Sequence, residues 1–157
     1  MRVSILIPVY NEFLTLPLVL QRVLDAPLPA GCEKEVIIID DGSTDGTTEL
    51  IQRLMERHRD VPLLVAHHSA VNFGKGAALR LGLAKATGDV ILVQDGDLEY
   101  DPNDYQKIIQ PFFAGADVVY GSRFLGDMKK KMKRLNWLAN KILTFAANVL
   151  YRAGITD

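Results

Sequence analysis

The sequence predicts an α/β fold in which a mostly parallel sheet carries helices on both faces. Short apolar runs rich in β-branched residues alternate with segments of helical periodicity, which is the pattern of parallel strands joined by crossover helices. These runs are continuously apolar, as expected for strands that are buried on both faces. The chain has 157 residues, the length of one ordinary domain, so we expect a single domain over residues 1–157.

The predicted strands are the short apolar runs. They are Val3–Val9, Val36–Ile39, Leu63–Ala66, Val90–Val93 and Val118–Tyr120. The predicted helices lie between and after them, marked by capping and helix-breaking residues. They are Thr15–Leu24, a helix that follows Ser43-Thr44-Asp45, Lys75–Ala86, a helix that begins at Asp101-Pro102, and Leu135–Tyr151. Pro111 should kink or end the fourth helix, because proline removes a backbone hydrogen bond and crowds the preceding turn.

Composition excludes several classes of protein. Hydrophobic residues make up 48% of the chain and charged residues 24%, which is typical of globular domains and not of disordered or collagen-like chains. The formal net charge of −1 counts against a surface built to hold nucleic acid. Cys32 is the one cysteine, so we expect no disulfide framework and a reducing compartment. No apolar run reaches the roughly 18 residues of a membrane span, and Val3–Val9 lacks a signal-peptide cleavage site, so we expect a cytoplasmic protein, at most peripheral to a membrane.

Polar loops follow the predicted strands, at the edge where open α/β sheets bind ligands. They read Tyr10-Asn11-Glu12, Asp40-Asp41-Gly42-Ser43, Gln94 to Glu99, and Gly121-Ser122-Arg123. Three of these loops are rich in acids, and we expect their strands to lie side by side. The sequence therefore predicts a cation-dependent site at this edge. The three histidines are interpreted as ordinary surface or strand-end residues, since neighbours on a strand point to opposite faces.

Acidic residues fall at every second position in one of these loops, at Asp95, Asp97, Glu99 and Asp101. On an extended chain that spacing points alternate side chains the same way. Two carboxylates about 5 Å apart repel by roughly 3 kcal/mol at an effective dielectric near 20, and a Mg²⁺ or Mn²⁺ ion would remove that cost. The alternative is a solvated acidic turn before a helix, and for Asp101 we prefer it, with the side chain as the helix N-cap.

Two well-known motifs can be excluded from the sequence. An EF-hand loop starting at Asp95 would need glycine where Tyr100 stands. A P-loop would need Ser or Thr after Gly74-Lys75, where the chain has Gly76. What remains is a glycine-flanked lysine at the start of a helix. Either Lys75 contacts an anion at the helix N-terminus, or the loop only needs its glycines for a positive φ.

Five segments in order along the chain carry a family pattern. They are Ile7 to Glu12, Asp40 to Thr47, Asn72 to Ala78, Gln94 to Glu99, and Gly121 to Phe124. The pattern resembles the family 2 glycosyltransferases, and within them the dolichol-phosphate or polyprenyl-phosphate mannosyltransferases. The resemblance implies a GT-A fold, a Mg²⁺ or Mn²⁺ ion, and an inverting transfer of a hexose, mannose from GDP-mannose, from a nucleotide-sugar donor to a polyprenyl or dolichyl phosphate.

The resemblance also implies roles for individual residues. Asp95, Asp97 and Arg123 match catalytic positions, and Asp97 and Glu99 match metal ligands. The donor-binding positions, with Lys75 added as the anion contact described above, form a larger set. They are Pro8, Tyr10, Glu12, Ile39, Asp41, Lys75, Asp95, Gly96, Asp97 and Arg123.

A basic run precedes the last predicted helix. It consists of Lys129, Lys130, Lys131, Lys133 and Arg134. Each such residue adds at most about 1 kcal/mol of attraction to an anionic membrane, so residues 129–157 could meet a membrane surface or the acceptor phosphate. The alternative is a solvated loop before a helix that packs on the domain. Relatives continue beyond a similar Thr156-Asp157, so we expect that the acceptor-side part is missing and that the chain can associate through the helix over 135–151.

Other functions stay open at this point. Within the same family, the donor could be UDP-glucose or another UDP-sugar, and the acceptor a lipid phosphate or a saccharide hydroxyl. The chain could also be an inactive fragment that binds a nucleoside diphosphate. A basic adaptor for nucleic acid ranks last, because no aromatic residues are interleaved in the basic run.

Overall fold

The computed structural model describes residues 1–121 and 134–151 and divides into two compact units, residues 1–113 and 114–157. The first unit holds all the strands of the described chain. Its elements are β1 (Arg2–Val9), α1 (Leu16–Asp25), β2 (Glu33–Asp40), α2 (Thr47–Arg57), β3 (Leu64–His68), α3 (Lys75–Lys85), β4 (Val90–Val93), the 3₁₀ helix η1 (Pro102–Asp104), α4 (Tyr105–Ile109) and the 3₁₀ helix η2 (Gln110–Ala114). The second unit contains α5 (Arg134–Tyr151).

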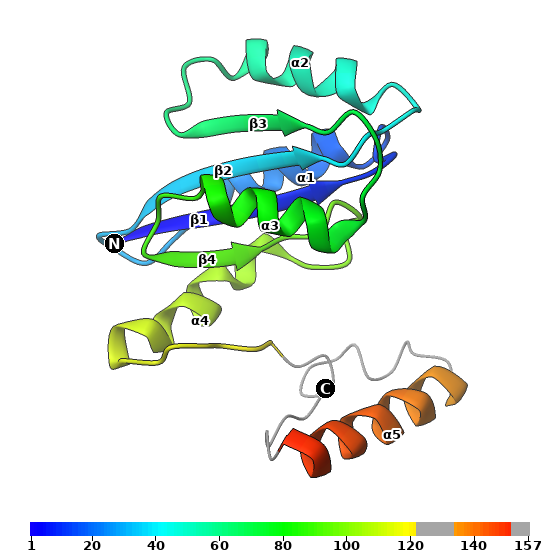
Figure 1. Cartoon of the computed structure of the whole chain (residues 1–157). Helices are drawn as coiled ribbons and strands as arrows, with labels where there is room; N and C mark the ends of the chain where they lie inside the picture. The colour runs from blue at the N-terminus through cyan, green and yellow to red at the C-terminus, as the bar shows by residue number, and fades with distance from the viewer. Residues whose placement is uncertain (122–133, 152–157) are drawn as a thin grey trace. The chain divides into compact units, whose positions relative to one another are not determined.

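The sheet of the first unit has four parallel strands in the order β3-β2-β1-β4. Helices α1 and α3 lie on opposite faces of it (Figure 1). The larger core cluster joins one face to α1, α2 and α4, and the smaller cluster joins the other face to α3. The prediction of a parallel sheet with helices on both faces is confirmed. The order also places β2, β1 and β4 side by side, so the three acid-rich loops emerge from adjacent strands.

The face beneath α3 changes character along the strands. In register, Ser4 pairs with Glu35 at the amino end, Leu6 with Ile37 in the middle, and Pro8 with Ile39 near the carboxyl end. Leu6, Ile37 and Ile39 are fully buried under α3. Gly82 of α3 makes this close packing possible, because a Cβ there would lie 2.9 Å from the Cδ1 atom of Ile39 and 3.2 Å from that of Leu6. This face is therefore polar at its amino end and apolar from its centre to Pro8 and Ile39.

The predicted strand Val118–Tyr120 is wrong. The segment has no regular structure, and Val118 and Tyr120 are exposed. A strand is stabilised by hydrogen bonds to a neighbour, and within the described chain no strand pairs with this segment. The prediction for Pro111 is confirmed, since α4 ends at Ile109 and the chain continues as a 3₁₀ helix.

The second unit contains α5, within one residue of the helix predicted over 135–151. The large apolar side chains described for this helix, such as Phe145, are exposed. Among the described residues, no helix is both long enough and apolar enough to cross a bilayer. Association through this helix stays a prediction, as does the single domain over residues 1–157.

Candidate functional site

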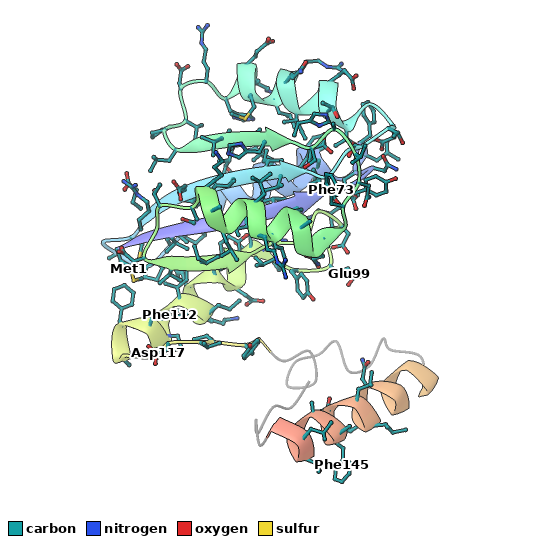
Figure 2. The ribbon with its side chains drawn as sticks, viewed as in Figure 1. Met1, Phe73, Glu99, Phe112, Asp117 and Phe145 are labelled. Atoms are coloured by element: carbon teal, nitrogen blue, oxygen red, sulfur yellow. The ribbon has the colours of Figure 1, made fainter. Side chains whose placement is uncertain are left out.

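A pocket of about 290 Å³ lies at the carboxyl ends of β1, β2 and β4. Figure 2 shows Phe73 and Glu99 at this end of the sheet and Met1 at the opposite end. Residues from four separate segments line the pocket. They are Pro8, Val9, Tyr10, Glu12, Asp41, Asn72, Lys75, Ala78, Asp95, Gly96 and Asp97. The site lies where open α/β sheets bind ligands, and it is built from the loops that the sequence singled out.

The loops after β1 and β2 are tied together. The backbone N–H of Asn11 donates to Ser43 Oγ at 2.9 Å, and the N–H of Thr44 donates to Asn11 Oδ1 at 2.8 Å. Asn11 adopts a left-handed conformation with φ of +58°, which asparagine tolerates better than most residues. These bonds fix the chain on either side of the exposed Tyr10 and the half-buried Glu12 at the pocket wall.

Asp41 organises the segment between β3 and α3. Its two carboxylate oxygens accept hydrogen bonds from the backbone N–H groups of Phe73 at 3.0 Å and Gly74 at 2.7 Å. Gly42 lets this segment approach, because a Cβ there would lie 2.4 Å from the carbonyl carbon of Val71. Asp41 is buried and each of its carboxylate oxygens accepts a hydrogen bond, so in this structure it holds the rim of the pocket in place.

Lys75 begins α3 and reaches across the pocket to the loop after β4. Its Nζ atom lies 2.5 Å from Asp95 Oδ1, and the lysine side chain is about half exposed. The ammonium group therefore lies inside the pocket, beside the carboxylates. Of the two alternatives for this glycine-flanked lysine, an anion contact is consistent with that position. Gly74 also has a positive φ of +89°, but Gly76 does not, so the second explanation holds for one of the two glycines.

The loop after β4 is anchored from below by Gln94, which sequence reasoning overlooked as a functional residue. Its side chain is buried and donates to the backbone oxygens of Asp95 at 3.1 Å and Tyr100 at 3.4 Å. The Tyr105 hydroxyl donates to Gln94 Oε1 at 2.7 Å, and burial raises the pKa of this phenol. The signal that could have revealed this anchor is a polar residue that directly continues a buried strand.

The alternating acids do not converge as predicted. The chain after Val93 is turned rather than extended, and Leu98 has a φ of +66°. Asp95 and Asp97 line the pocket but Glu99 does not, and the Glu99 backbone N–H donates to Asp97 Oδ1 at 3.1 Å. Within the described ranges, no group of three His, Cys, Asp or Glu residues is placed to hold a metal ion. Asp101 accepts a hydrogen bond from the N–H of Asn103 at 3.0 Å, as an N-cap should.

Eight of the predicted donor-binding residues line the pocket, and Ile39 does not. Ile39 is fully buried between the sheet and α3, so it offers no surface to a ligand in this structure. Arg123 lies outside the described residues, as do Lys129, Lys130, Lys131 and Lys133 of the basic run; Arg134 begins α5, and its side chain is not described. The roles assigned to all these residues, including Glu99 as a metal ligand, stay predictions.

The fold of the chain is that of GT-A glycosyltransferases. The family model "Glycosyl transferase family 2" matches residues 4–156, and the chain belongs to this family.

Several curated relatives are named undecaprenyl-phosphate 4-deoxy-4-formamido-L-arabinose transferase. The relative from Pseudomonas aeruginosa is 38% identical over 117 residues, and that from Aeromonas hydrophila is 40% identical over 119. In both comparisons the match covers 74% of this chain. The chain spans about a third of the length of these relatives, 34% and 35% respectively. Their names contain a polyprenyl phosphate, as predicted, but an arabinose derivative where the resemblance implied mannose.

Solved structures agree on the fold. A mannosyltransferase from Pyrobaculum calidifontis in complex with GDP-Man and Mn²⁺ is 31% identical with a TM-score of 0.57, and the match covers 66% of this chain and 29% of that one. S. aureus TarS 1–349 in complex with UDP-GlcNAc is 28% identical with a TM-score of 0.53, and the match covers 62% and 27%. GalNAc-T7 is 23% identical with a TM-score of 0.61, covering 71% and 21%, and it supports the fold alone.

Proposed function

We propose that this chain is the donor-binding part of a glycosyltransferase that moves a sugar from a nucleoside-diphosphate donor to a polyprenyl phosphate. The observation that carries the proposal is the pocket, which brings Asp95, Asp97 and Lys75 together at the carboxyl edge of the sheet. The family membership and the polyprenyl-phosphate names of the curated relatives support the same reaction.

The pocket has groups for both parts of such a donor. Tyr10 is 46% exposed and offers an aromatic surface for a nucleobase. Lys75 carries a positive charge suited to the diphosphate, and its ion pair keeps it over Asp95. Gly96 leaves room beside them, because a Cβ there would lie 3.3 Å from both Glu12 Cγ and Val9 Cγ1. A larger residue at this position would crowd the wall of the pocket.

The residues present fit a divalent metal ion. Asp95 and Asp97 supply carboxylate oxygens, and Mg²⁺ or Mn²⁺ typically takes one or two carboxylates together with phosphate oxygens. When bound, such an ion offsets the negative charge that grows on the leaving diphosphate. Asp97 is the better ligand, because Lys75 already neutralises one oxygen of Asp95. Lys75 adds its own positive charge on the same side of the pocket.

The acceptor requires little further chemistry from the protein. A lipid phosphate is already ionised at neutral pH, so its oxygen can attack the sugar without a strong general base. Inversion at the sugar carbon follows from a single displacement of that kind. A saccharide hydroxyl would instead need a carboxylate within hydrogen-bond reach to take its proton. We assign the acceptor phosphate and any anionic membrane surface to the basic run at 129–134, and Arg123 to the donor phosphates.

Two donors deserve a direct comparison. GDP-mannose is the donor that we infer from the sequence, and the Pyrobaculum calidifontis mannosyltransferase was solved with it. A nucleotide-linked 4-deoxy-4-formamido-L-arabinose is favoured by the names of the curated relatives. The pocket geometry suits the diphosphate that both donors share. The two donors differ in the sugar and the base, so contacts to these two groups determine which donor binds.

The test is the binding and transfer of labelled sugar. Calorimetry with GDP-mannose, UDP-glucose and UDP-4-deoxy-4-formamido-L-arabinose, each with and without Mn²⁺, should identify one donor whose binding requires the metal. Asp97→Asn should weaken that binding by about 100-fold, whereas Asp104→Asn, an exposed acid outside the pocket, should leave it unchanged. Transfer to undecaprenyl phosphate is then measured with the selected donor. Metal-independent binding in the Asp97 variant and the wild type alike would contradict the site.

A further inference from the structure

A second cavity lies away from the pocket, between α2 and the edge strand β3. It has a volume of about 430 Å³, which is within the range of small-molecule sites. We call it the α2 cavity. The residues that line it are Asp40, Thr48, Ile51, Gln52, Met55, Glu56, Ala66, His67 and His68. This cavity has no role in the proposed glycosyl transfer.

One end of the α2 cavity carries an oriented imidazole. Asp40 Oδ2 lies 2.9 Å from His68 Nδ1 and accepts a hydrogen bond from Thr48 Oγ1 at 2.5 Å. Burial alone would raise the pKa of Asp40, but hydrogen bonds from Ser43, Thr48 and His68 outweigh it and hold the pKa below its ordinary value. Because an ionised carboxylate only accepts hydrogen bonds, Nδ1 of His68 must carry the proton. In the neutral ring, Nε2 is then a free acceptor.

This Nε2 atom is available to a ligand. The side chain of His68 is 47% exposed, and no hydrogen bond to Nε2 occurs among the described residues. Asp40 behind it is only 1% exposed, so its charge acts on a ligand through the ring rather than by direct contact. A group that donates a hydrogen bond and carries a positive charge satisfies both residues.

The other end of the cavity carries a second negative charge. Glu56 is exposed and lines the cavity two turns of α2 beyond Thr48. At 1.5 Å per residue, Thr48 and Glu56 are about 12 Å apart along the helix. Between them Ile51, Met55 and Ala66 form an apolar strip of the wall, and the uncharged Gln52 also lines the cavity there. The cavity therefore has two acidic ends separated by an apolar middle.

This pattern selects one class of ligand. No lysine or arginine is among the described lining residues, so an anion would meet two negative charges without a partner. A metal ion is disfavoured, because no group of three metal-ligating side chains is found in the described chain. We propose that the α2 cavity binds a linear aliphatic diamine or polyamine. One ammonium group donates to His68 Nε2, another lies beside Glu56, and the methylene chain packs on Met55.

Titration of spermidine into the whole chain, followed by NMR, tests the proposal. The His68 ring and the Met55 methyl group should shift together with one saturation curve. Glu56→Gln should weaken spermidine binding by about threefold, the size expected when an exposed ion pair is lost. Glu49→Gln removes an equally exposed charge from the same helix outside the cavity, and it should leave the affinity unchanged.

Three results would overturn the proposal. One is the absence of a saturable shift at the His68 ring. Another is an equal loss of affinity in the Glu56 and Glu49 variants, which would mean general attraction of a cation to an acidic helix. The third is equal affinity for spermidine and n-butylamine, because a monoamine cannot engage both ends of the cavity.

Discussion

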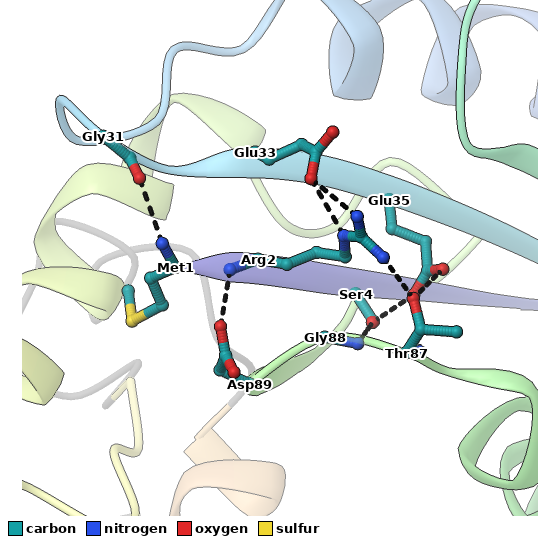
Figure 3. Close-up of polar contacts among 9 residues, drawn as sticks. All are labelled: Met1, Arg2, Ser4, Gly31, Glu33, Glu35, Thr87, Gly88 and Asp89. Atoms are coloured by element: carbon teal, nitrogen blue, oxygen red, sulfur yellow. Dashed lines mark hydrogen bonds and ion pairs between the residues drawn. The ribbon is translucent and has the colours of Figure 1, made fainter.

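The two ends of the sheet both gather carboxylates, but they use them differently. At the amino end, Glu35 lies in a closed network with Ser4, Thr87 and Arg2 (Figure 3). At the carboxyl end, Asp95 and Asp97 line an open pocket. Both sets of side chains are placed by the same parallel strands, so the difference lies in their partners.

At the amino end, both oxygens of the buried carboxylate accept hydrogen bonds. The buried Glu35 accepts hydrogen bonds from Ser4 Oγ, from the Thr87 backbone N–H at 2.9 Å and from Thr87 Oγ1 at 2.7 Å. Arg2 in turn donates to Thr87 Oγ1 at 2.8 Å and forms an ion pair with Glu33 at 2.9 Å. Every one of these groups contributes to joining β1, β2 and the chain that enters β4.

At the carboxyl end, some carboxylate oxygens accept no hydrogen bond from the residues that the structure describes. One oxygen of Asp95 contacts Lys75 and one oxygen of Asp97 accepts a backbone hydrogen bond, while the second oxygen of each has no partner among the described residues. A buried acid with all its partners stabilises a fold, whereas an accessible acid with an unused oxygen can bind a ligand. The comparison predicts that mutations at the amino end change stability and that mutations at the carboxyl end change binding.

Glu35→Ala should give the largest effect. It leaves the buried Ser4 hydroxyl without its acceptor and removes both hydrogen bonds from the exposed Thr87, so the free energy of unfolding should fall by about 3 kcal/mol. Urea denaturation measures the loss. Donor affinity, measured on the folded fraction, should stay unchanged. Glu33→Ala is the matched control, and its exposed ion pair should contribute less than about 1 kcal/mol. If the two variants lost equal free energy of unfolding, the buried Glu35 would be no more important for stability than the exposed Glu33.

Two glycine substitutions sharpen the comparison. A Cβ at Gly88 would lie 2.5 Å from Ser4 Oγ, and a Cβ at Gly42 would lie 2.4 Å from the carbonyl carbon of Val71. Gly88→Ala and Gly42→Ala should each reduce stability by about 2 kcal/mol, because both crowd a packed contact. Only Gly42→Ala should also weaken donor binding, since it displaces the segment that carries Asn72 into the pocket. Thermal unfolding and calorimetry on both variants separate the two effects.

The sequence predicted this carboxyl-end site well where strand order alone decides it. Tyr10, Asp41 and Asp95 follow buried apolar runs, and parallel strands bring the ends of such runs to one edge. The strands themselves could be predicted because a strand that is buried on both faces appears in the sequence as a continuous run of apolar, β-branched residues. The same property leaves the orientation of Ile39 undetermined by the sequence, and its role in donor binding stays a prediction. A strand that is apolar on both faces does not reveal which side chain faces α3.

The remaining errors come from contacts that are distant in sequence or from local backbone geometry. Glu99 was expected to point the same way as Asp97, but Leu98 between them has a positive φ and the chain turns there, so the role of Glu99 as a metal ligand stays a prediction. Val118–Tyr120 has the composition of a strand without a neighbour to pair with in the described chain. Glu35 was not singled out, because its three hydrogen bonds come from Ser4 and Thr87, which lie 31 and 52 residues away.

Lys75→Met should have a smaller effect, confined to binding. The ion pair with Asp95 is partly exposed, so its loss should change the free energy of unfolding by less than about 1 kcal/mol. Donor affinity should fall by about tenfold, because the pocket loses its positive charge and the Asp95 carboxylate its counter-charge. Calorimetry with the selected donor measures this, and Lys75→Arg should recover part of the affinity. A variant with lower stability and full affinity would assign Lys75 to the fold instead.

The smallest expected effect is a difference between the wild type and Glu35→Gln in how the free energy of unfolding depends on pH. Burial alone would raise the pKa of Glu35, but the hydrogen bonds from Ser4 and Thr87 and the charge of Arg2 hold it below its ordinary value of 4.5. A carboxyl group with a lower pKa in the folded state stabilises the fold above its unfolded pKa, and this contribution is lost as the pH falls through the folded pKa. The difference in the free energy of unfolding between the two proteins should therefore be constant near neutral pH and shrink as the pH falls below 4.5. Urea denaturation over a series of pH values measures it. If the difference persisted undiminished to about pH 2, Glu35 would act through its shape alone, and the amino end would owe nothing to the charge of its buried acid.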